Sequence, residues 1–259
     1  MDEPAYGDPV RRLLEIGRAS TDGVWPHYPT LYGLTGAHVA ELARMTTDAS
    51  FDELDGDSPA VYAPVHAWRA LGQLGASAAG AVDALVSLLP RVDERDDDWV
   101  GTEVPEVLGL IGPASLPRLA QFLADDAQPP WARVEAGKAI KHVGLRHASA
   151  RPLCVELLSR QLERFVSQPV ELNSFLVAWL IDLQAREAAG VIERAMRAPG
   201  RVDRTIIGDW EQVRVDLGLA PPSVRPLRAT PWMLDFAVES VLGAPPTEAE
   251  PEWMKGIRW

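Results

Sequence analysis

Apolar residues recur along the chain at helical spacing, in blocks that end in a similar way in four segments. The blocks align on one residue that follows the last apolar position of each. These anchors are Gly75, Gly112, Gly144 and Gln184, at intervals of 37, 32 and 40 residues. Apolar residues precede every anchor by one, four and eight positions, which places them on one face of a helix. Intervals of this length are typical of repeated helical hairpins.

A second apolar stripe follows each anchor, so each repeat is predicted to contain two helices. The second helices are expected at residues 81–89, 116–124, 151–165 and 188–196. The anchor residue is expected to end the first helix in a left-handed backbone conformation. Ser77, Ser115 and Ser149 are predicted to cap three of the second helices. Pro117 and Pro152 fall in first turns, where proline is tolerated.

The two ends of the chain depart from this pattern. Residues 9–55 contain two predicted helices, at 9–17 and 36–47, around an aromatic loop, and residues 204–219 look like a degenerate last hairpin. Stacked repeats need atypical end units, because an inner repeat at the end would expose its apolar face. The predicted regions are an N-terminal helical cap (1–60), the repeats (61–219), and an extension with a linker, a short helix and a tail (220–259).

Several strings in the chain resemble HEAT repeats of the phycobilisome-lyase-like type. The strings are VYAPVHAWRALGQLGA, DDDWV, PEVLGLIGP, ELNSFLVAWLIDL and GRVDRTIIGDWEQVRVDLGL, and they are similar to a bacterial group of uncharacterised HEAT proteins over about residues 25–220. The resemblance implies an all-α fold, a right-handed α-α superhelix (a HEAT-like solenoid) of about five helical hairpins. Many members of that group end in a cysteine-rich SEC-C zinc motif. This chain lacks that motif, because Cys154 is its only cysteine.

No segment alternates apolar and polar residues with a sustained period of two, so a mixed α/β fold remains only as the alternative. The net charge of −12 and the pI of about 4.9 disfavour nucleic acid as a partner, because an acidic surface repels phosphates. A basic protein or peptide is the expected partner. The N-terminus lacks the features of a signal peptide and no stretch is apolar enough to cross a membrane, so we expect a cytoplasmic protein without a membrane partner.

The repeat alignment also brings aromatic and polar residues into register. The aromatic residues, thirteen positions before the anchors, are Tyr62, Trp99 and Trp131, and the polar residues, nine positions before them, are His66, Glu103 and Glu135. Each ring therefore precedes its polar neighbour by one helical turn. One hypothesis is a binding ridge, in which the rings are anchors and the carboxylates attract Arg or Lys. The alternative is that the rings pack between repeats and the carboxylates favour helix N-termini.

The densest acidic run, residues 93–99, contains Asp96, Asp97 and Asp98 at a predicted turn between repeats. It is either a docking surface for a basic partner or a solvated loop that also caps the following helix. The C-terminal residues 253–259, WMKGIRW, are either a peptide that docks on a partner or on the repeats, or a strap on the last helices.

Some HEAT-like enzymes hold iron with adjacent His-Glu pairs on successive first helices, so the resemblance raises the possibility of a metal site. The corresponding pairs here are Val65-His66, Thr102-Glu103 and Val134-Glu135, which lack the adjacent histidines. We therefore predict no metal and no cofactor. The sequence also has no phosphate-binding glycine motif and no order of residues that indicates a Ser-His-Asp or Cys-His site.

The leading hypothesis is a non-catalytic interaction or adaptor protein that binds its partner through an acidic, aromatic-containing surface. One alternative is an acidic inhibitor or immunity-type protein that masks a basic site. The other is a HEAT-type enzyme of the lyase-like or glycosylase-like kind, which would need polar residues that converge in a groove.

Overall fold

The computed structural model describes residues 6–221, and this part of the chain is helical without a strand. The chain divides into a main unit, described over residues 6–19 and 25–221, and a second unit, described over residues 20–24. The predicted helix at 231–243 and the WMKGIRW segment lie outside the described residues. The all-α prediction is confirmed for the described residues.

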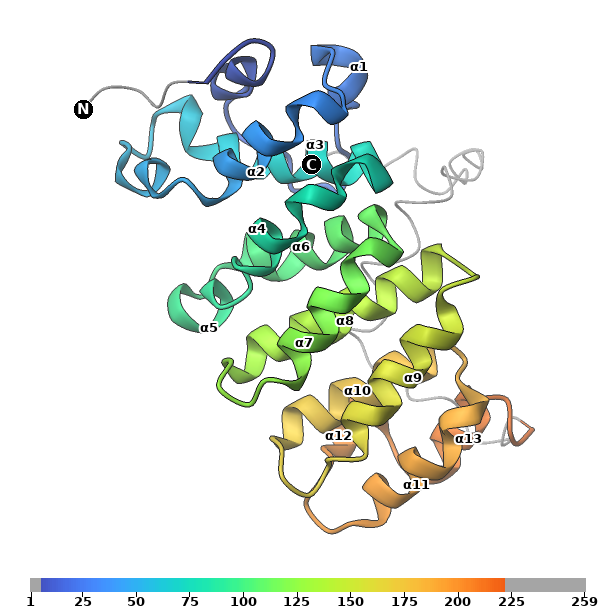
Figure 1. Ribbon diagram of the computed structural model, residues 1–259. Coiled ribbons are helices and arrows are strands. Elements are labelled where there is room, and N and C mark those ends of the chain that lie inside the picture. Colours follow the sequence, from blue (N-terminus) through green and yellow to red (C-terminus); the bar gives the residue numbers. More distant parts are fainter. Residues whose placement is uncertain (1–5, 222–259) are drawn as a thin grey trace, which may run out of the picture. The chain divides into compact units, whose positions relative to one another are not determined.

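Helices of the main unit form two layers (Figure 1). Each helix of a layer contacts the next helix of that layer along the chain. The first layer is α1 (Tyr28–Tyr32), α3 (Ala63–Leu74), α6 (Asp98–Ile111), α8 (Pro130–Arg146), α10 (Val170–Asp182) and α12 (Arg204–Ile207). The second layer is α2 (Val39–Thr47), α4 (Val82–Val86), α7 (Leu116–Ala124), α9 (Arg151–Leu162), α11 (Ala189–Arg197) and α13 (Trp210–Asp216).

Short 3-10 helices and one extra α-helix join these elements. The 3-10 helices are η1 (Val10–Glu15), η2 (Gly36–His38), η3 (Ala49–Glu53), η4 (Pro59–Tyr62), η5 (Gly75–Ala81), η6 (Pro113–Ser115) and η7 (Arg186–Ala188). The extra helix, α5 (Arg91–Arg95), overlaps the start of the acidic run 93–99, which was predicted to be a turn. The predicted helix at 9–17 is the 3-10 helix η1, and α1 forms inside the predicted aromatic loop.

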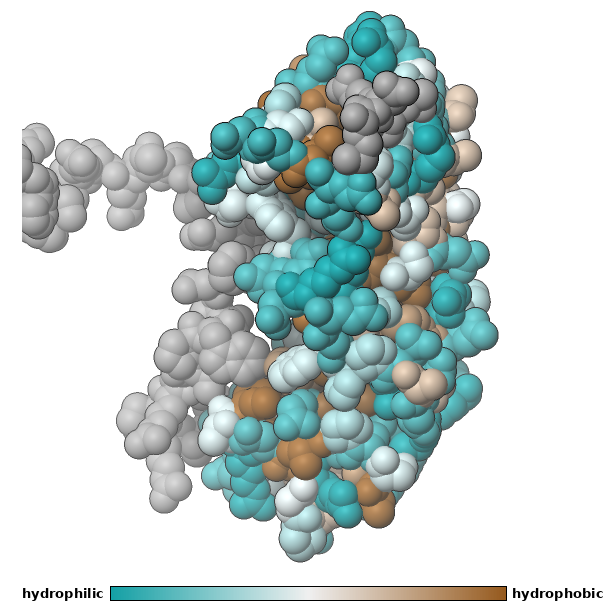
Figure 2. Space-filling model, turned by 90° about the vertical axis from the view of Figure 1, so that its left-hand side faces the viewer, coloured by the Kyte–Doolittle hydropathy of each residue, from teal (hydrophilic) through white to brown (hydrophobic). Residues whose placement is uncertain are grey.

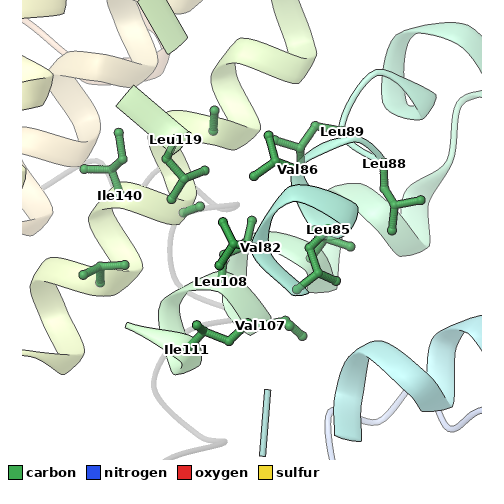
Figure 3. Close-up of a cluster of buried hydrophobic side chains, with 14 of the residues drawn as sticks. Val82, Leu85, Val86, Leu88, Leu89, Val107, Leu108, Ile111, Leu119 and Ile140 are labelled. Carbon is green, nitrogen blue, oxygen red and sulfur yellow. The ribbon is translucent and has the colours of Figure 1, made fainter. Parts of the chain in front are cut away.

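The interior between the two layers is a continuous apolar core. Figure 3 shows one part of it, in which side chains from α4, α6, α7 and α8 meet. Leu85, Leu108, Leu119 and Ile140 are completely buried there. Ile140 and Leu108 stand four positions before an anchor, so this column of the repeat alignment does face the core, as helical spacing requires.

Three of the four anchor residues follow the end of a first helix, but Gly75 and Gly112, with ψ angles of −135° and −148°, do not adopt the predicted left-handed helical conformation. Gly75, Gly112 and Gln184 have positive φ angles of 57°, 90° and 52°. A non-glycine residue is uncommon in this conformation. The side-chain amide of Gln184 is held there, because its Nε2 donates to the carbonyls of Ile181 and Asp216.

The prediction for Gly144 is wrong, because α8 continues past it to Arg146. Gly144 is instead a point of close helix packing. A Cβ atom on it would lie 2.7 Å from Leu183 Cδ2 and 3.1 Å from Cys154 Cβ. The residue is glycine for lack of space and not for backbone conformation.

Of the predicted serine caps, only Ser115 lies at an N-cap position, that of α7. Its side chain makes no capping bond, because Oγ donates to the Leu108 carbonyl at 3.0 Å. Ser77 lies inside η5 and Ser149 precedes the N-cap residue of α9, so these two predictions are wrong. Pro117 and Pro152 do lie in first turns. Among the described helices no single one is long and apolar enough to cross a membrane; by length and composition, only α6 combined with Pro113–Ala124 passes, and the two are bent by 111°.

Candidate functional site

The predicted aromatic row is divided in the structure. Tyr62, at the end of η4, packs edge-on against Trp99 of α6, with ring centroids 6.3 Å apart, and both are half-buried. Trp131, in the first turn of α8, packs edge-on against Phe175 of α10 at 5.9 Å and is 44% exposed. Trp131 is thus the member of the row that offers a large apolar surface to a ligand.

Glu103 of the predicted polar column is buried in an ion pair with Arg69 of α3. Its carboxylate accepts bonds from Arg69 Nε at 2.8 Å, Arg69 Nη2 at 2.5 Å and Trp68 Nε1 at 2.8 Å. The Arg69 guanidinium also lies over the rings of Trp25 and Trp99, at 5.3 and 5.5 Å. Glu103 therefore joins α3 to α6, and its acceptor atoms are committed within the protein.

Both ring nitrogens of His66 also have hydrogen-bond partners within the protein. The imidazole is 2% exposed, with Nδ1 2.7 Å from the Tyr28 hydroxyl and Nε2 2.8 Å from the Gly17 carbonyl oxygen. The prediction that His66 and Glu103 stand beside the rings on a binding ridge is therefore wrong. The alternative is confirmed for the rings of Tyr62 and Trp99, which pack on each other, but not for Glu103, which pairs with Arg69 instead of lying at a helix N-terminus.

The remaining predicted residues converge on one open pocket of about 330 Å³. It lies where α5, α6 and α8 meet. Its lining includes Asp96, Asp97, Asp98, Trp131 and Glu135, together with Val92, Gly101, Thr102 and Lys138. In Figure 1, α5 and the turn between α7 and α8 lie on the left, and Figure 2 views the main unit from that side, where hydrophilic residues dominate its middle.

The acidic side of the pocket is formed by three consecutive aspartates. Asp96 ends α5 in a left-handed conformation with φ 51°, Asp97 caps α6 by accepting from Val100 N at 3.1 Å, and Asp98 begins α6. The predicted capping role of the acidic run is thus confirmed for Asp97. Within residues 6–221, no basic side chain forms an ion pair with any of the three.

Glu135 and Lys138 form the inner side of the pocket. Lys138 Nζ lies 3.1 Å from Glu135 Oε2 and donates to the Gly101 carbonyl at 2.9 Å. Burial raises the pKa of Glu135, and the neighbouring Lys138 opposes that shift. The pocket therefore holds four carboxyl groups against one ammonium group, which makes it a place for a cationic group.

Asp93 positions Trp131, which the sequence analysis did not foresee. Its two carboxylate oxygens accept from the backbone amides of Trp131 and Ala132, at 3.1 and 2.7 Å. A side chain of α5 thus caps α8 from outside, at amides that the helix itself leaves without acceptors. No local pattern could reveal this, because the residues are 38 and 39 positions apart.

Replacing Asp93 with alanine is expected to lower the free energy of unfolding by about 1 kcal/mol, because two amides at a helix N-terminus lose their acceptor. Urea unfolding followed by circular dichroism measures the change. Glu94→Ala is the matched control, since Glu94 is an exposed neighbour in α5, and it should change stability by less than about 0.5 kcal/mol. Equal losses in the two variants would mean that the cap contributes nothing specific.

The described residues contain no group of three or more His, Cys, Asp or Glu side chains that could hold a metal ion. Cys154 is buried, and burial raises the pKa of its thiol to about 11, so it does not act as a thiolate at neutral pH.

No family model, curated protein or solved structure matches this chain. The resemblance to HEAT repeats accordingly stays a prediction. An exposed indole beside carboxylates without ion pairs can hold the guanidinium of an arginine or the ammonium of a lysine.

Proposed function

We propose that this protein is a HEAT-like solenoid that binds a basic protein or peptide without catalysing a reaction. A right-handed α-α superhelix of about five hairpins agrees with the two layers of helices in the main unit. It also agrees with the residues of positive φ that follow three of the first helices. Such repeats offer extended surfaces that serve as binding sites.

The pocket at Trp131 carries the proposal. Trp131 is the one large aromatic side chain among the exposed large hydrophobic residues of the described part. A cation that stacks on this ring would lie close to the carboxylates of Asp96 and Asp98. Aromatic side chains and charge complementarity of this kind anchor a partner and speed its approach. The net charge of −12 favours the same class of partner.

A fluorescein-labelled peptide of alternating arginine and glycine is the probe that tests this function. Its affinity for the full chain is measured by fluorescence anisotropy at low and high salt. Binding is expected to weaken as salt rises, because exposed charges are screened. Trp131→Ala and the double variant Asp96→Asn/Asp98→Asn should each weaken it by about tenfold or more, equivalent to about 1.4 kcal/mol. Asparagine tolerates the left-handed conformation of Asp96.

The matched control is Glu53→Gln/Asp57→Asn. Both residues are exposed and do not line the pocket, and the change removes the same amount of charge. If this variant weakens the peptide as much as the pocket variants do, attraction is only a matter of net charge and the proposed site is wrong. Full affinity in Trp131→Ala would also contradict the proposal.

A further inference from the structure

A chain of hydrogen bonds with a defined direction fastens the N-terminal part of the main unit to α3. The Gly17 carbonyl can only accept, so His66 Nε2 carries the proton of the 2.8 Å bond between them. Nδ1 of the neutral ring is then an acceptor, and the Tyr28 hydroxyl must donate to it at 2.7 Å. The positive charge of Arg69 also acts on Tyr28, where it lowers the pKa of the hydroxyl against the effect of burial. We call this chain the Tyr28–His66 relay.

The relay joins three elements. Gly17 follows η1, Tyr28 begins α1, and His66 and Arg69 lie on α3. Tyr28 is completely buried and His66 almost so, which means that water does not replace a lost bond at low cost. The direction of both bonds is fixed, because the Gly17 carbonyl at one end of the relay can only accept.

A proton on Nδ1 of His66 is incompatible with this arrangement. The Tyr28 hydroxyl could then no longer donate to Nδ1, so its proton would lose its acceptor in the relay, and the imidazolium would add a second positive charge beside that of Arg69. The charged groups that face His66 are Arg69 on its own helix and Glu103 from α6, while α1 contributes the Tyr28 hydroxyl and the loop contributes the Gly17 carbonyl. Glu103 is already engaged by Arg69 and compensates the new charge only in part.

We propose that the Tyr28–His66 relay is a proton-operated fastener, meaning a set of hydrogen bonds that protonation weakens. One proton on His66 loosens the Gly17 segment and α1 from α3 while the rest of the main unit stays folded. Gln73 of α3 limits the extent of this opening, because it still links residues 26–28 to α3. Its side chain accepts from Tyr28 N at 2.8 Å and donates to the Pro26 carbonyl at 2.9 Å, and neither bond depends on a titrating group.

The direction of the effect follows from linkage. Burial lowers the pKa of His66 from its ordinary value of 6.5, Arg69 lowers it further, and the Gly17 bond and Glu103 oppose the shift. A depressed pKa in the closed state means that the fastener is at full strength above pH 6.5. The fastener weakens as the pH falls through the folded-state pKa. Between pH 6.5 and the folded-state pKa, the equilibrium constant for opening rises by up to about tenfold for each pH unit that the pH falls, since one proton is taken up.

Nitrogen NMR of the full chain with ¹⁵N-labelled histidine tests the relay without a mutation. At about pH 7 the His66 ring is expected to be the neutral tautomer protonated at Nε2. Its titration midpoint should fall below 6.5. The signal is assigned by its loss in His66→Gln. A ring protonated at Nδ1, or a midpoint above 6.5, would overturn the proposal.

Hydrogen exchange, read by mass spectrometry and corrected for the intrinsic rate, tests the opening itself. Peptides over residues 10–17 and 28–34 should lose protection from about pH 7 to about pH 5 in the natural chain and keep it in His66→Gln. His142→Gln is the matched control, because burial also lowers the pKa of His142 while it lies on α8. That variant should respond like the natural chain.

Tyr28→Phe supplies a second variant. It removes the donor to Nδ1, so protonation costs less and the loss of protection should shift to higher pH. If the natural chain and His66→Gln lose protection alike, the fastener does not depend on His66 and the proposal is wrong. The peptide-binding measurement at the Trp131 pocket is independent of this result.

Discussion

Replacing Glu103 with alanine is expected to destabilise the protein by about 3–5 kcal/mol, because a buried ion pair that loses one partner leaves an uncompensated charge. The Arg69 side chain is 1% exposed and donates two hydrogen bonds to this carboxylate. Trp68 Nε1 would lose its acceptor at the same time. Since domains are stable by only about 5–15 kcal/mol, the loss is a large share of the total.

Urea unfolding at neutral pH, followed by circular dichroism, measures this effect. Glu106→Ala is the control from the same helix. Glu106 forms an ion pair with Arg146 that is closer to solvent, with side chains 32% and 21% exposed. The free energy of unfolding of this variant should therefore fall by less than about 1 kcal/mol. Glu103→Gln keeps the volume and serves if the alanine variant does not fold. Similar losses at Glu103 and Glu106 would mean that burial adds nothing to the Arg69 pair.

Replacing Gly109 with alanine is expected to cost about 1–3 kcal/mol, because the added methyl group overpacks the contact of α6 with α8. A Cβ atom on Gly109 would lie 2.5 Å from His142 Cβ and 3.2 Å from the His142 carbonyl carbon. These atoms belong to or adjoin the backbone, so no side-chain rotation can relieve the overlap. The two helices would have to move apart along a shared face of the first layer.

Gly137→Ala is the matched control, because Gly137 is also a buried glycine inside a helix of the first layer. Its Cβ atom would meet Trp179 and Leu158 no closer than 3.5 Å, which is ordinary contact. Here alanine should be neutral or stabilise the protein by up to about 1 kcal/mol through helix propensity. Thermal unfolding of both variants provides the comparison. A Gly109→Ala protein as stable as the Gly137→Ala protein would contradict the tight contact.

Helical periodicity predicted much of the fold. The apolar columns around Leu108 and Ile140 face the core, and the end of three first helices was placed correctly from the anchor residues. These features depend on residues within a few turns of one another, so the local sequence contains the information. Gly144 shows the limit. Glycine serves a left-handed end or a close contact equally well, and only the neighbouring helices decide which.

The candidate site was predicted in part. The sequence indicated an aromatic and acidic surface, and Trp131, Glu135 and the three aspartates do share a pocket. The sequence could not show that His66 and Glu103, which occupy equivalent positions in the repeat, are buried and hydrogen-bonded to partners within the protein. The available signal was Arg69, a charge inside an apolar helix, which requires a buried counter-charge.

The sequence by itself determined the helices, their apolar faces and the overall sign of the charge, because each depends on neighbours along the chain. The tertiary structure decided the partners of the polar groups. Arg69 and Glu103 are 34 positions apart, and Asp93 caps amides 38 and 39 positions away. Ion pairs and caps act over a few ångströms of space, so their choice depends on how the helices pack. The same packing leaves Trp131 exposed beside the aspartates and buries the histidine and the glutamate of the other repeats.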